Sequence, residues 1–345
     1  MYTSSLLETV RALSTPGKGI LAADESGATV GKRFAANGIE STEETRRAYR
    51  DMLITTPGIN QYIAGVILFD ETLHQKTLDD TLFPDKLKQL GILAGIKVDK
   101  GLVDLVGTDH EQITQGLDGL SERLAEYREK GASFAKWRAV YPISDKTPSM
   151  QAIKTNAECL ARYAAICQAN GIVPIVEPEV LFEGDHTIER CAEVTESVLH
   201  ILFHALFRHK VTLEHMVLKP SMVIHGKNGS KKASVDEVAR QTLMVLRRTV
   251  PSAVPTINFL SGGQSALDAT AHLNAMHKLM PTLPWNLSYS YARALQENPM
   301  RIWDGKKENI VAAQQAFACR AKLNSLAAKG QYAVSMEKEK ECVPS

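Results

Sequence analysis

The sequence predicts a single-domain α/β fold: a (β/α)8 TIM barrel with an extra N-terminal helix and a flexible C-terminal tail. Eight short β-rich runs alternate with longer segments in which apolar residues recur every three or four positions. No repeat, low-complexity tract or Pro/Gly/Ser-rich linker divides the 345 residues. Alternating strands and helices imply parallel βαβ units, and eight units fit a closed barrel better than the alternative, a doubly wound sheet.

The elements follow one another in a regular order. The runs typical of strands are GILAAD (19–24), YIAGVILF (62–69), LAGIKVD (93–99), FAKWRAV (134–140), IVPIVEP (172–178), HMVLKPS (215–221), TINFLSG (256–262) and LPWNLSYS (283–290). The helical segments are 4–14, 43–53, 116–130, 149–170, 186–208, 234–249, 265–278 and 307–327. Residues 70–91 show neither pattern clearly. Pro148, after Thr147, suits the first turn of a helix, and Ser265 suits a helix cap.

The bounds of the domain follow from the end of the last helical pattern. We expect residues 1–332 to form the barrel. Residues 333–345 alternate in charge and hold little apolar surface, so we expect them to be a disordered tail.

Composition excludes several classes of protein. Forty basic and 39 acidic residues give a net charge of +1, which does not favour nucleic-acid binding. No apolar run approaches the roughly 20 residues of a membrane span, and the N-terminus lacks the apolar segment of a signal peptide. Five scattered cysteines with no C-x-x-C pair indicate reduced thiols rather than a disulfide framework or a zinc knuckle. The expected location is the cytoplasm.

Polar side chains interrupt the apolar runs near their carboxyl ends, which is the face where barrel enzymes place their active sites. They are Asp24, Lys97, Lys136, Arg138, Glu177, Glu179, Lys219 and Ser261. Ion pairs that plug a barrel mouth are the alternative for any single residue, but the whole set at one end predicts an active site.

Lys219 is the candidate nucleophile. It follows the apolar residues Met216–Leu218 and precedes Pro220, which keeps it extended. Desolvation and neighbouring cations such as Lys136 favour the neutral, nucleophilic amine. Glu177 and Glu179 are available to move the protons that imine formation requires. This combination predicts Schiff-base chemistry on a carbonyl compound.

A phosphate site is predicted after the last two strands. Ser261-Gly262-Gly263 leads into a helix, and glycines there let backbone N–H groups converge on an anion. Ser290 and Arg293 add a hydroxyl group and a guanidinium after the eighth strand. The alternative for the two glycines alone is a simple tight turn. No metal site is predicted, because His200 and His204 lack a third ligand.

At this point the residues resemble a known family, class I (Schiff-base) fructose-bisphosphate aldolase, from about residue 5 to 332. The matching stretches are GKGILAADES (17–26), GIKVDKG (95–101), TQGLDGLSER (114–123), FAKWR (134–138), NGIVPIVEPE (170–179), LKPSMV (218–223), FLSGGQS (259–265) and GKKEN (305–309). The resemblance implies reversible cleavage of fructose 1,6-bisphosphate to dihydroxyacetone phosphate and glyceraldehyde 3-phosphate, without a cofactor. It also implies a homotetramer.

The resemblance assigns roles to individual residues. Lys219 forms the imine, Glu177 transfers protons, Asp24 helps remove the hydroxyl proton, and Lys136 and Glu179 tune the charge beside the imine. The implied phosphate contacts are Arg33, Ser261, Gly262, Gly263, Ser290 and Arg293, with Lys97, Arg46 and Arg138 as further contributors.

Two departures and several alternatives remain at this stage. Ala292 stands where relatives carry glycine, and the C-terminus lacks the terminal tyrosine of animal-type relatives. The alternatives are a Schiff-base aldolase for a related sugar phosphate, metal-dependent aldol cleavage, and a barrel with a scaffolding role.

Overall fold

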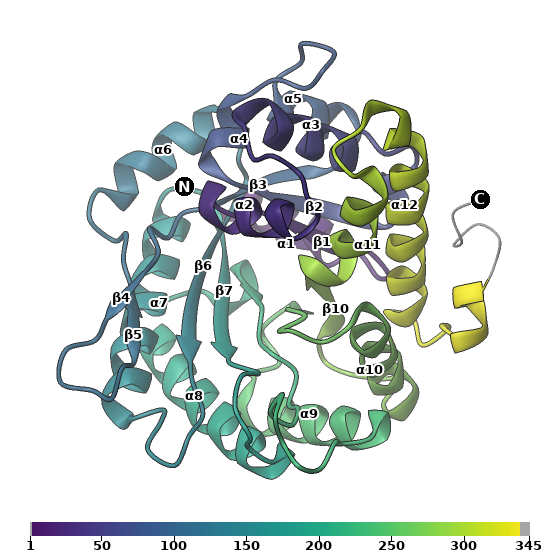
Figure 1. The fold of residues 1–345 in the computed structure, drawn as a ribbon. Coiled ribbons are helices and arrows are strands. Elements are labelled where there is room, and N and C mark those ends of the chain that lie inside the picture. The colour runs from purple at the N-terminus through teal and green to yellow at the C-terminus, as the bar shows by residue number, and fades with distance from the viewer. Residues whose placement is uncertain (1, 339–345) are drawn as a thin grey trace.

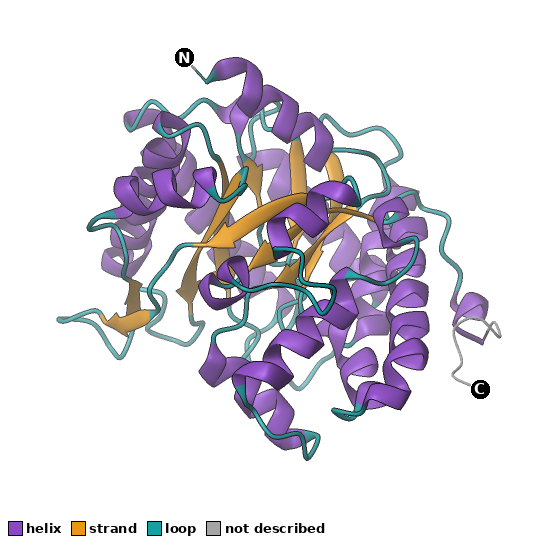
Figure 2. Ribbon diagram, turned by 90° about the horizontal axis from the view of Figure 1, so that it is seen from above, coloured by secondary structure: helices purple, strands orange, loops and turns teal. Residues whose placement is uncertain are grey.

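The computed structural model describes residues 2–338, which form a closed barrel of eight parallel strands surrounded by helices (Figures 1 and 2). The barrel strands are β1 (Gly19–Ala23), β2 (Ile63–Leu68), β3 (Leu93–Lys97), β6 (Phe134–Tyr141), β7 (Val173–Val180), β8 (Val217–Leu218), β9 (Thr256–Phe259) and β10 (Asn286–Tyr291). Each pairs with its neighbour along the chain, and β10 closes the ring against β1. All eight predicted strands are confirmed, and closure excludes the doubly wound alternative.

The predicted helices are also confirmed, with ends that differ by a few residues. They are α1 (Thr3–Leu13), α3 (Glu43–Ile54), α6 (Leu120–Glu129), α7 (Met150–Ala169), α8 (Ile188–Arg208), α9 (Val235–Thr249), α10 (Ala266–Leu279) and α12 (Ile310–Ala327). Ser265 caps α10 as predicted, because its hydroxyl accepts from the Asp268 N–H at 3.0 Å. The start of α7 differs from the prediction: its cap is Ser149, whose hydroxyl accepts from the Ala152 N–H at 3.1 Å.

Several elements lie where no regular structure was predicted. They are α2 (Gly27–Ala36), α4 (Asp70–His74), α5 (Phe83–Gln89), α11 (Arg293–Trp303), the antiparallel pair β4 (Leu102–Asp104) and β5 (Gln112–Thr114), and the 3-10 turns η1 (Ile59–Gln61) and η4 (Val334–Lys338). Two more 3-10 turns overlap predicted elements: η3 (Lys307–Asn309) lies in the predicted helix 307–327, and η2 (Leu213–His215) ends at the first residue of the predicted strand 215–221.

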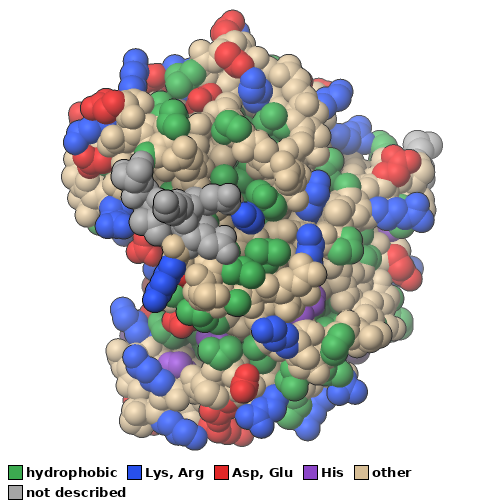
Figure 3. All heavy atoms as spheres, turned by 90° about the vertical axis from the view of Figure 1, so that its right-hand side faces the viewer, with side chains coloured by type: hydrophobic (Ala, Val, Ile, Leu, Met, Phe, Trp, Pro, Cys, Tyr) green, Lys and Arg blue, Asp and Glu red, His purple; other side chains and the backbone are tan. Residues whose placement is uncertain are grey.

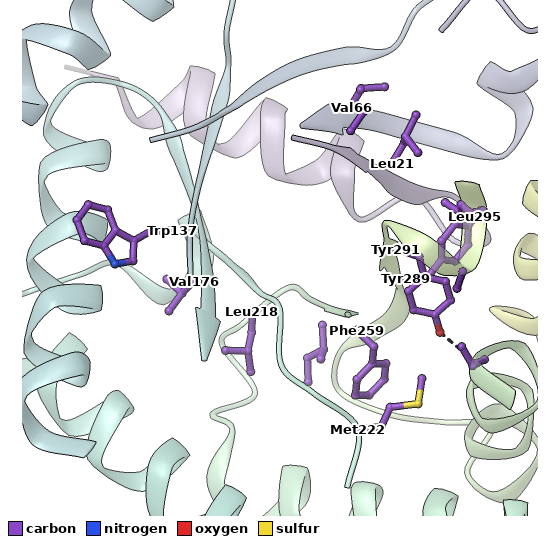
Figure 4. Packing of buried hydrophobic residues seen from close by; sticks show 14 of the residues in the cluster. Leu21, Val66, Trp137, Val176, Leu218, Met222, Phe259, Tyr289, Tyr291 and Leu295 are labelled. Carbon is purple, nitrogen blue, oxygen red and sulfur yellow. Dashed lines mark hydrogen bonds between the residues drawn. The ribbon is translucent and has the colours of Figure 1, made fainter. Parts of the chain in front are cut away.

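The barrel separates two apolar cores because successive strand residues face opposite sides of the sheet. The outer core lies between the strands and the helices; Figure 4 shows part of it, with Leu21, Val66, Trp137, Val176 and Leu218 turned away from the barrel axis. The inner core uses the alternate positions and includes Ile20, Ala22, Phe134, Val173, Ile175 and Val217.

Helix α1 closes the amino-terminal end of this inner core. Leu6, Val10 and Leu13 are buried against the interior strand residues. The Phe134 ring fills the space beside Gly95, where an added Cβ would lie only 2.1 Å from a ring carbon. The amino-terminal end of the barrel is therefore packed with side chains, and polar groups have room only at the carboxyl ends of the strands.

The C-terminal segment differs from the disordered tail expected from residue 333. Val334–Lys338 forms η4, and both Glu337 carboxylate oxygens accept from the Arg320 guanidinium, at 2.8 and 2.7 Å. The Tyr332 hydroxyl donates to the same carboxylate at 2.9 Å. These charge-assisted bonds, together with Met336 partly buried against the outer core, hold the segment in place. The rest of the expected tail, 339–345, lies outside the described residues.

The remaining surface and the cysteines complete the description. On the face shown in Figure 3, acidic and basic side chains are interspersed, as the balanced composition predicts. Cys159, Cys167 and Cys191 are buried free thiols.

Candidate active site

A cleft of about 420 Å³ opens at the carboxyl ends of the barrel strands. Most of the predicted site residues line it: Asp24, Arg33, Lys97, Lys136, Arg138, Glu177, Glu179, Lys219, Ser261, Gly262, Ser290 and Arg293. Gly263 and Arg46 are not among its lining residues. The Arg46 guanidinium instead donates to the Glu71 carboxylate, with Nε 2.8 Å from one oxygen.

Strand periodicity explains why these side chains meet. In β7, Val173 and Ile175 face the barrel interior, so Glu177 and Glu179 continue the same row toward the open end. In β6 the same period of two places Lys136 and Arg138 on the interior face, after Phe134. Asp24 follows Ala22 of β1, and Lys219 follows Val217 of β8 in the same way. The site is thus the top polar layer of the barrel interior.

Four of these residues form a buried chain of ion pairs. The Lys219 ammonium lies 3.2 Å from Oε1 of Glu177. The Lys136 ammonium lies 3.3 Å from Oε2 of the same carboxylate and 2.7 Å from Oδ2 of Asp24. All four side chains are less than a tenth exposed. Two ammonium groups and two carboxylates cancel in charge, which limits the cost of burying them.

The electrostatics distinguish the two lysines. Burial alone would lower the pKa of Lys136, but the Asp24 and Glu177 carboxylates outweigh it and raise that pKa well above its ordinary value. Lys136 is therefore held as a cation. Burial would likewise raise the pKa of Asp24, but Lys136 and then Lys219 outweigh it and hold that pKa well below the ordinary range. Lys219 faces one carboxylate at ion-pair distance rather than two.

Two further ion pairs flank the buried chain. Arg138 Nε lies 2.5 Å from the Glu179 carboxylate. Burial alone would lower the pKa of Arg138, but the Glu179 carboxylate outweighs burial and raises that pKa. The Lys97 ammonium lies 2.6 Å from the Asp99 carboxylate. Sequence reasoning missed Asp99, although its position two residues after Lys97 was a usable signal.

The Ser261-Gly262-Gly263 turn has the backbone that glycine permits. Gly262 and Gly263 have φ of 50° and 84°, in the left-handed region, and the Gln264 N–H closes the turn on the Ser261 carbonyl at 3.0 Å. The buried Ser290 hydroxyl has no hydrogen-bond partner within the described chain. It belongs to the cleft lining, where it is available to a ligand.

The start of helix α11, which carries Arg293, forms another wall of the cleft. Ala292 occupies its N-cap position with a negative φ of −101°, outside the left-handed region that favours glycine. The departure from glycine at 292 therefore leaves the local backbone path open to alanine. Backbone N–H groups at the start of a helix favour an anion, and Arg293 adds a full charge there.

Helix α2 contributes a third part of the cleft, which sequence reasoning identified only through Arg33. Glu25, Ser26 and Thr29 also line the cleft. Ser26 caps the helix by accepting from the Thr29 N–H at 3.3 Å. Glu25, Ser26 and Thr29 follow Asp24 directly along the chain, so proximity to a predicted site residue was the available signal.

Residues 2–338 contain neither a metal-binding cluster nor a membrane-spanning helix. Within them, no group of three or more His, Cys, Asp or Glu side chains could hold a metal ion. The helices of the same range include none that is long and apolar enough to cross a bilayer.

The fold and the cleft define a class of protein: a (β/α)8 barrel with a buried lysine beside a carboxylate, an arrangement typical of enzymes that form imines with carbonyl compounds. The model of the family "fructose-bisphosphate aldolase class-I" matches residues 5–343. The chain belongs to this family.

Individual relatives agree with the family model. The chain is 54% identical to cytosolic fructose-bisphosphate aldolase 4 of Arabidopsis thaliana over 96% of this chain and 84% of that protein. It is 52% identical to the aldolase of Dictyostelium discoideum, over 96% and 93% of the two chains. Among solved structures, Plasmodium falciparum aldolase, in complex with TRAP and a small-molecule inhibitor, superposes with a TM-score of 0.95 at 48% identity, covering 96% of each chain.

Proposed function

We propose that this chain cleaves fructose 1,6-bisphosphate reversibly to dihydroxyacetone phosphate and glyceraldehyde 3-phosphate, with Lys219 as the imine-forming nucleophile. As a member of the class I aldolase family it is a carbon–carbon lyase. The observation that carries the assignment to Lys219 is the contrast between the two buried lysines. Lys136 is held charged by two carboxylates, whereas Lys219 has one carboxylate at 3.2 Å to receive its proton.

Imine formation needs two proton movements that Glu177 can serve. The Lys219 ammonium first transfers a proton to the carboxylate, and the free amine then attacks the ketose carbonyl carbon to form a carbinolamine. Glu177, now protonated, returns a proton to the leaving hydroxyl group, which departs as water. The product is a protonated imine, so the positive charge remains at Lys219.

Carbon–carbon cleavage then uses the protonated imine as the electron acceptor. A base removes the proton of the hydroxyl group two carbons from the imine carbon, the C–C bond breaks, and its electrons form an enamine. Asp24 is suited to this role because its depressed pKa keeps it ionised. Lys136, at 2.7 Å from Asp24, stabilises the anionic form near the reacting atoms. Protonation of the enamine and hydrolysis of the imine regenerate Lys219.

Two anion-binding regions in one cleft support a bisphosphate as the substrate. Ser261, Gly262, Ser290 and Arg293 form one, and the start of α2 with Ser26 and Arg33 forms the other. Arg138, which pairs with Glu179, and Lys97, which pairs with Asp99, serve as additional contributors. Arg46 is bound to Glu71 and lies outside the lining, so we give it no direct contact with substrate in this proposal.

A coupled cleavage assay with excess chelator tests the proposal. We expect turnover of fructose 1,6-bisphosphate that chelator does not reduce. Product analysis with fructose 1-phosphate and other ketose phosphates separates this activity from that of a Schiff-base aldolase for a related sugar phosphate. Loss of activity with chelator would establish metal-dependent cleavage instead.

Two properties of the whole molecule belong to the same proposal. We propose a homotetramer in the cytoplasm; the second part is supported by relatives whose names describe them as cytosolic. Light scattering coupled to gel filtration measures the mass of the assembly directly, and a dimer or monomer would overturn the first part.

A further inference from the structure

One buried carboxylate in the cleft wall is shared by two arginines. Glu25 accepts from Arg33 through Oε1 and pairs with Arg50 through Oε2, at 2.8 Å from the Arg50 NH2. The same Arg50 nitrogen also donates to the Glu25 backbone carbonyl at 3.3 Å. The three side chains carry two positive charges and one negative charge, so a net charge of +1 remains at this wall.

The two arginines differ in their access to the cleft. Arg33 and Glu25 are among the lining residues, and the Arg33 side chain is 22% exposed. Arg50, in α3, is 2% exposed and is not among them. Its guanidinium carbon lies 5.6 Å from the centre of the Tyr49 ring. Arg50 therefore reaches a bound substrate only through Glu25 and Arg33.

Tyr49, which precedes Arg50 in α3, connects this part of the helix to the barrel through hydrogen bonds. The Tyr49 hydroxyl donates to Gln296 Oε1 at 3.1 Å, and Gln296 Nε2 donates to the Ala22 carbonyl of β1 at 2.6 Å. Both Tyr49 and Gln296 are fully buried. This chain of contacts places the Arg50 end of α3 in a defined position against the strand that carries Asp24.

Two other cations of the cleft, Lys97 and Arg138, pair with carboxylates that have no second cationic partner among residues 2–338. Lys97 pairs with Asp99, and Arg138 pairs with Glu179, one to one. If such a cation turned to a phosphate group, its carboxylate would lose its ion-pair partner. A largely buried carboxylate without a partner is costly in free energy. Glu25 would still have Arg50 if Arg33 turned away.

We infer that Arg50 is a positioning residue, which neutralises Glu25 so that Arg33 can exchange that carboxylate for a substrate phosphate. Glu25 holds Arg33 in place in the free protein, and the phosphate takes over its donors in the complex. Arg50 makes the exchange possible without contacting the substrate. The inference rests on the phosphate-binding part of the proposed function.

The test is a set of variants titrated with inorganic phosphate by isothermal calorimetry. Arg50→Gln keeps the side-chain polarity but removes the charge, so Glu25 depends on Arg33 alone. We expect its phosphate dissociation constant to rise roughly tenfold, which is the loss of affinity expected when one hydrogen bond to a charged group is removed. Arg50→Lys, which keeps the charge, is the matched control and should stay within about twofold of the wild type.

Two double variants separate this role from a purely structural one. Glu25→Gln combined with Arg50→Gln should restore phosphate binding, because the amide no longer competes for Arg33. In an Arg33→Gln background, Arg50→Gln should have little further effect, because the residue through which it acts is absent. Absence of rescue in the first, or an undiminished effect in the second, would overturn the inference.

Folding and function are controlled separately. If Arg50→Gln does not fold, Glu25→Gln alone tests the same exchange, since it should bind phosphate at least as tightly as the wild type; weaker binding contradicts the inference. In folded Arg50→Gln, KM for fructose 1,6-bisphosphate should rise with kcat little changed. Wild-type turnover of that sugar tests the proposed function independently of the phosphate titrations.

Discussion

Replacement of Lys136 by methionine removes the cation that links the two buried carboxylates of Asp24 and Glu177. In the wild type its ammonium lies 2.7 Å from Asp24 and 3.3 Å from Glu177, and all three side chains are buried. Lys136→Met leaves Asp24 and Glu177 with only Lys219 between them. Removal of one partner from a buried ion pair costs about 3–5 kcal/mol of the free energy of unfolding. Loss of a charge aimed at the reacting atoms should reduce kcat about 100- to 1,000-fold.

The dependence on pH follows from the depressed pKa of Asp24. A carboxylate whose pKa is lower in the folded state stabilises the fold above its unfolded value, 3.8, and loses that contribution as the pH falls below it. Lys136→Met raises the folded pKa of Asp24, so its contribution shrinks. The difference in unfolding free energy between the two proteins should therefore be largest near pH 7 and narrow below about pH 4.

Urea unfolding at several pH values and steady-state cleavage assays measure these effects. Asp24→Asn with Lys136→Met is the matched control, because it removes the charge and its strongest partner together and should recover part of the lost stability. A Lys136→Met protein as stable as the wild type at pH 7 would refute the ion-pair reasoning. A penalty that stays constant with pH would refute the role of Asp24 in it.

Three further predictions address single features of the structure. Glu177→Gln should fold normally and lower kcat about 100-fold or more, because proton transfer during imine formation loses its carboxylate; stopped-flow measurement of imine formation identifies the slowed step, and unchanged imine formation rules out this role. Arg293→Ala should raise KM for phosphorylated substrates by roughly 10- to 100-fold, and an equal loss on unphosphorylated fructose would assign Arg293 to structure or chemistry instead. Ending the chain after Tyr332 should lower the unfolding free energy by about 1–3 kcal/mol in urea titrations, because Glu337 no longer pairs with Arg320, whereas an unchanged value would make that ion pair irrelevant to stability.

The barrel and its central residues were accessible from the sequence because local patterns encode them. Each strand carries a continuous apolar run, and the period of two places Lys136, Glu177 and Lys219 in the interior row. A charged residue at the end of such an apolar row is unusual, and for this reason the sequence alone indicates Lys219 as the candidate nucleophile.

The elements that sequence reasoning missed have weak local signals. In α2 only Val30 and Phe34 are buried, and two glycines dilute the helical pattern. Helix α11 contains Pro299, which normally indicates the end of a helix. Both helices begin at the cleft, and without these helical patterns the positions of their N-termini could not be predicted.

The ion pairs of Arg46 and Arg50 were missed for a different reason. Arg46 and Glu71 are 25 residues apart, and Arg50 meets Glu25 across the same separation, so their pairing depends on the closed barrel rather than on spacing. Arg46 was identified from the sequence and Arg50 was not, and in both cases the position relative to the cleft depends on these long-range pairs. Arg46 shows the consequence: it was expected at the phosphate and is bound to Glu71.

Borohydride trapping tests the central claim, that Lys219 is the nucleophile, most directly. Incubation with dihydroxyacetone phosphate and borohydride should reduce an imine to a stable secondary amine and inactivate the enzyme. Peptide mass mapping should place the adduct on Lys219, and Lys219→Met should neither be labelled nor turn over fructose 1,6-bisphosphate. An adduct on Lys97 or Lys136, or full turnover with no trapped imine, would contradict the account.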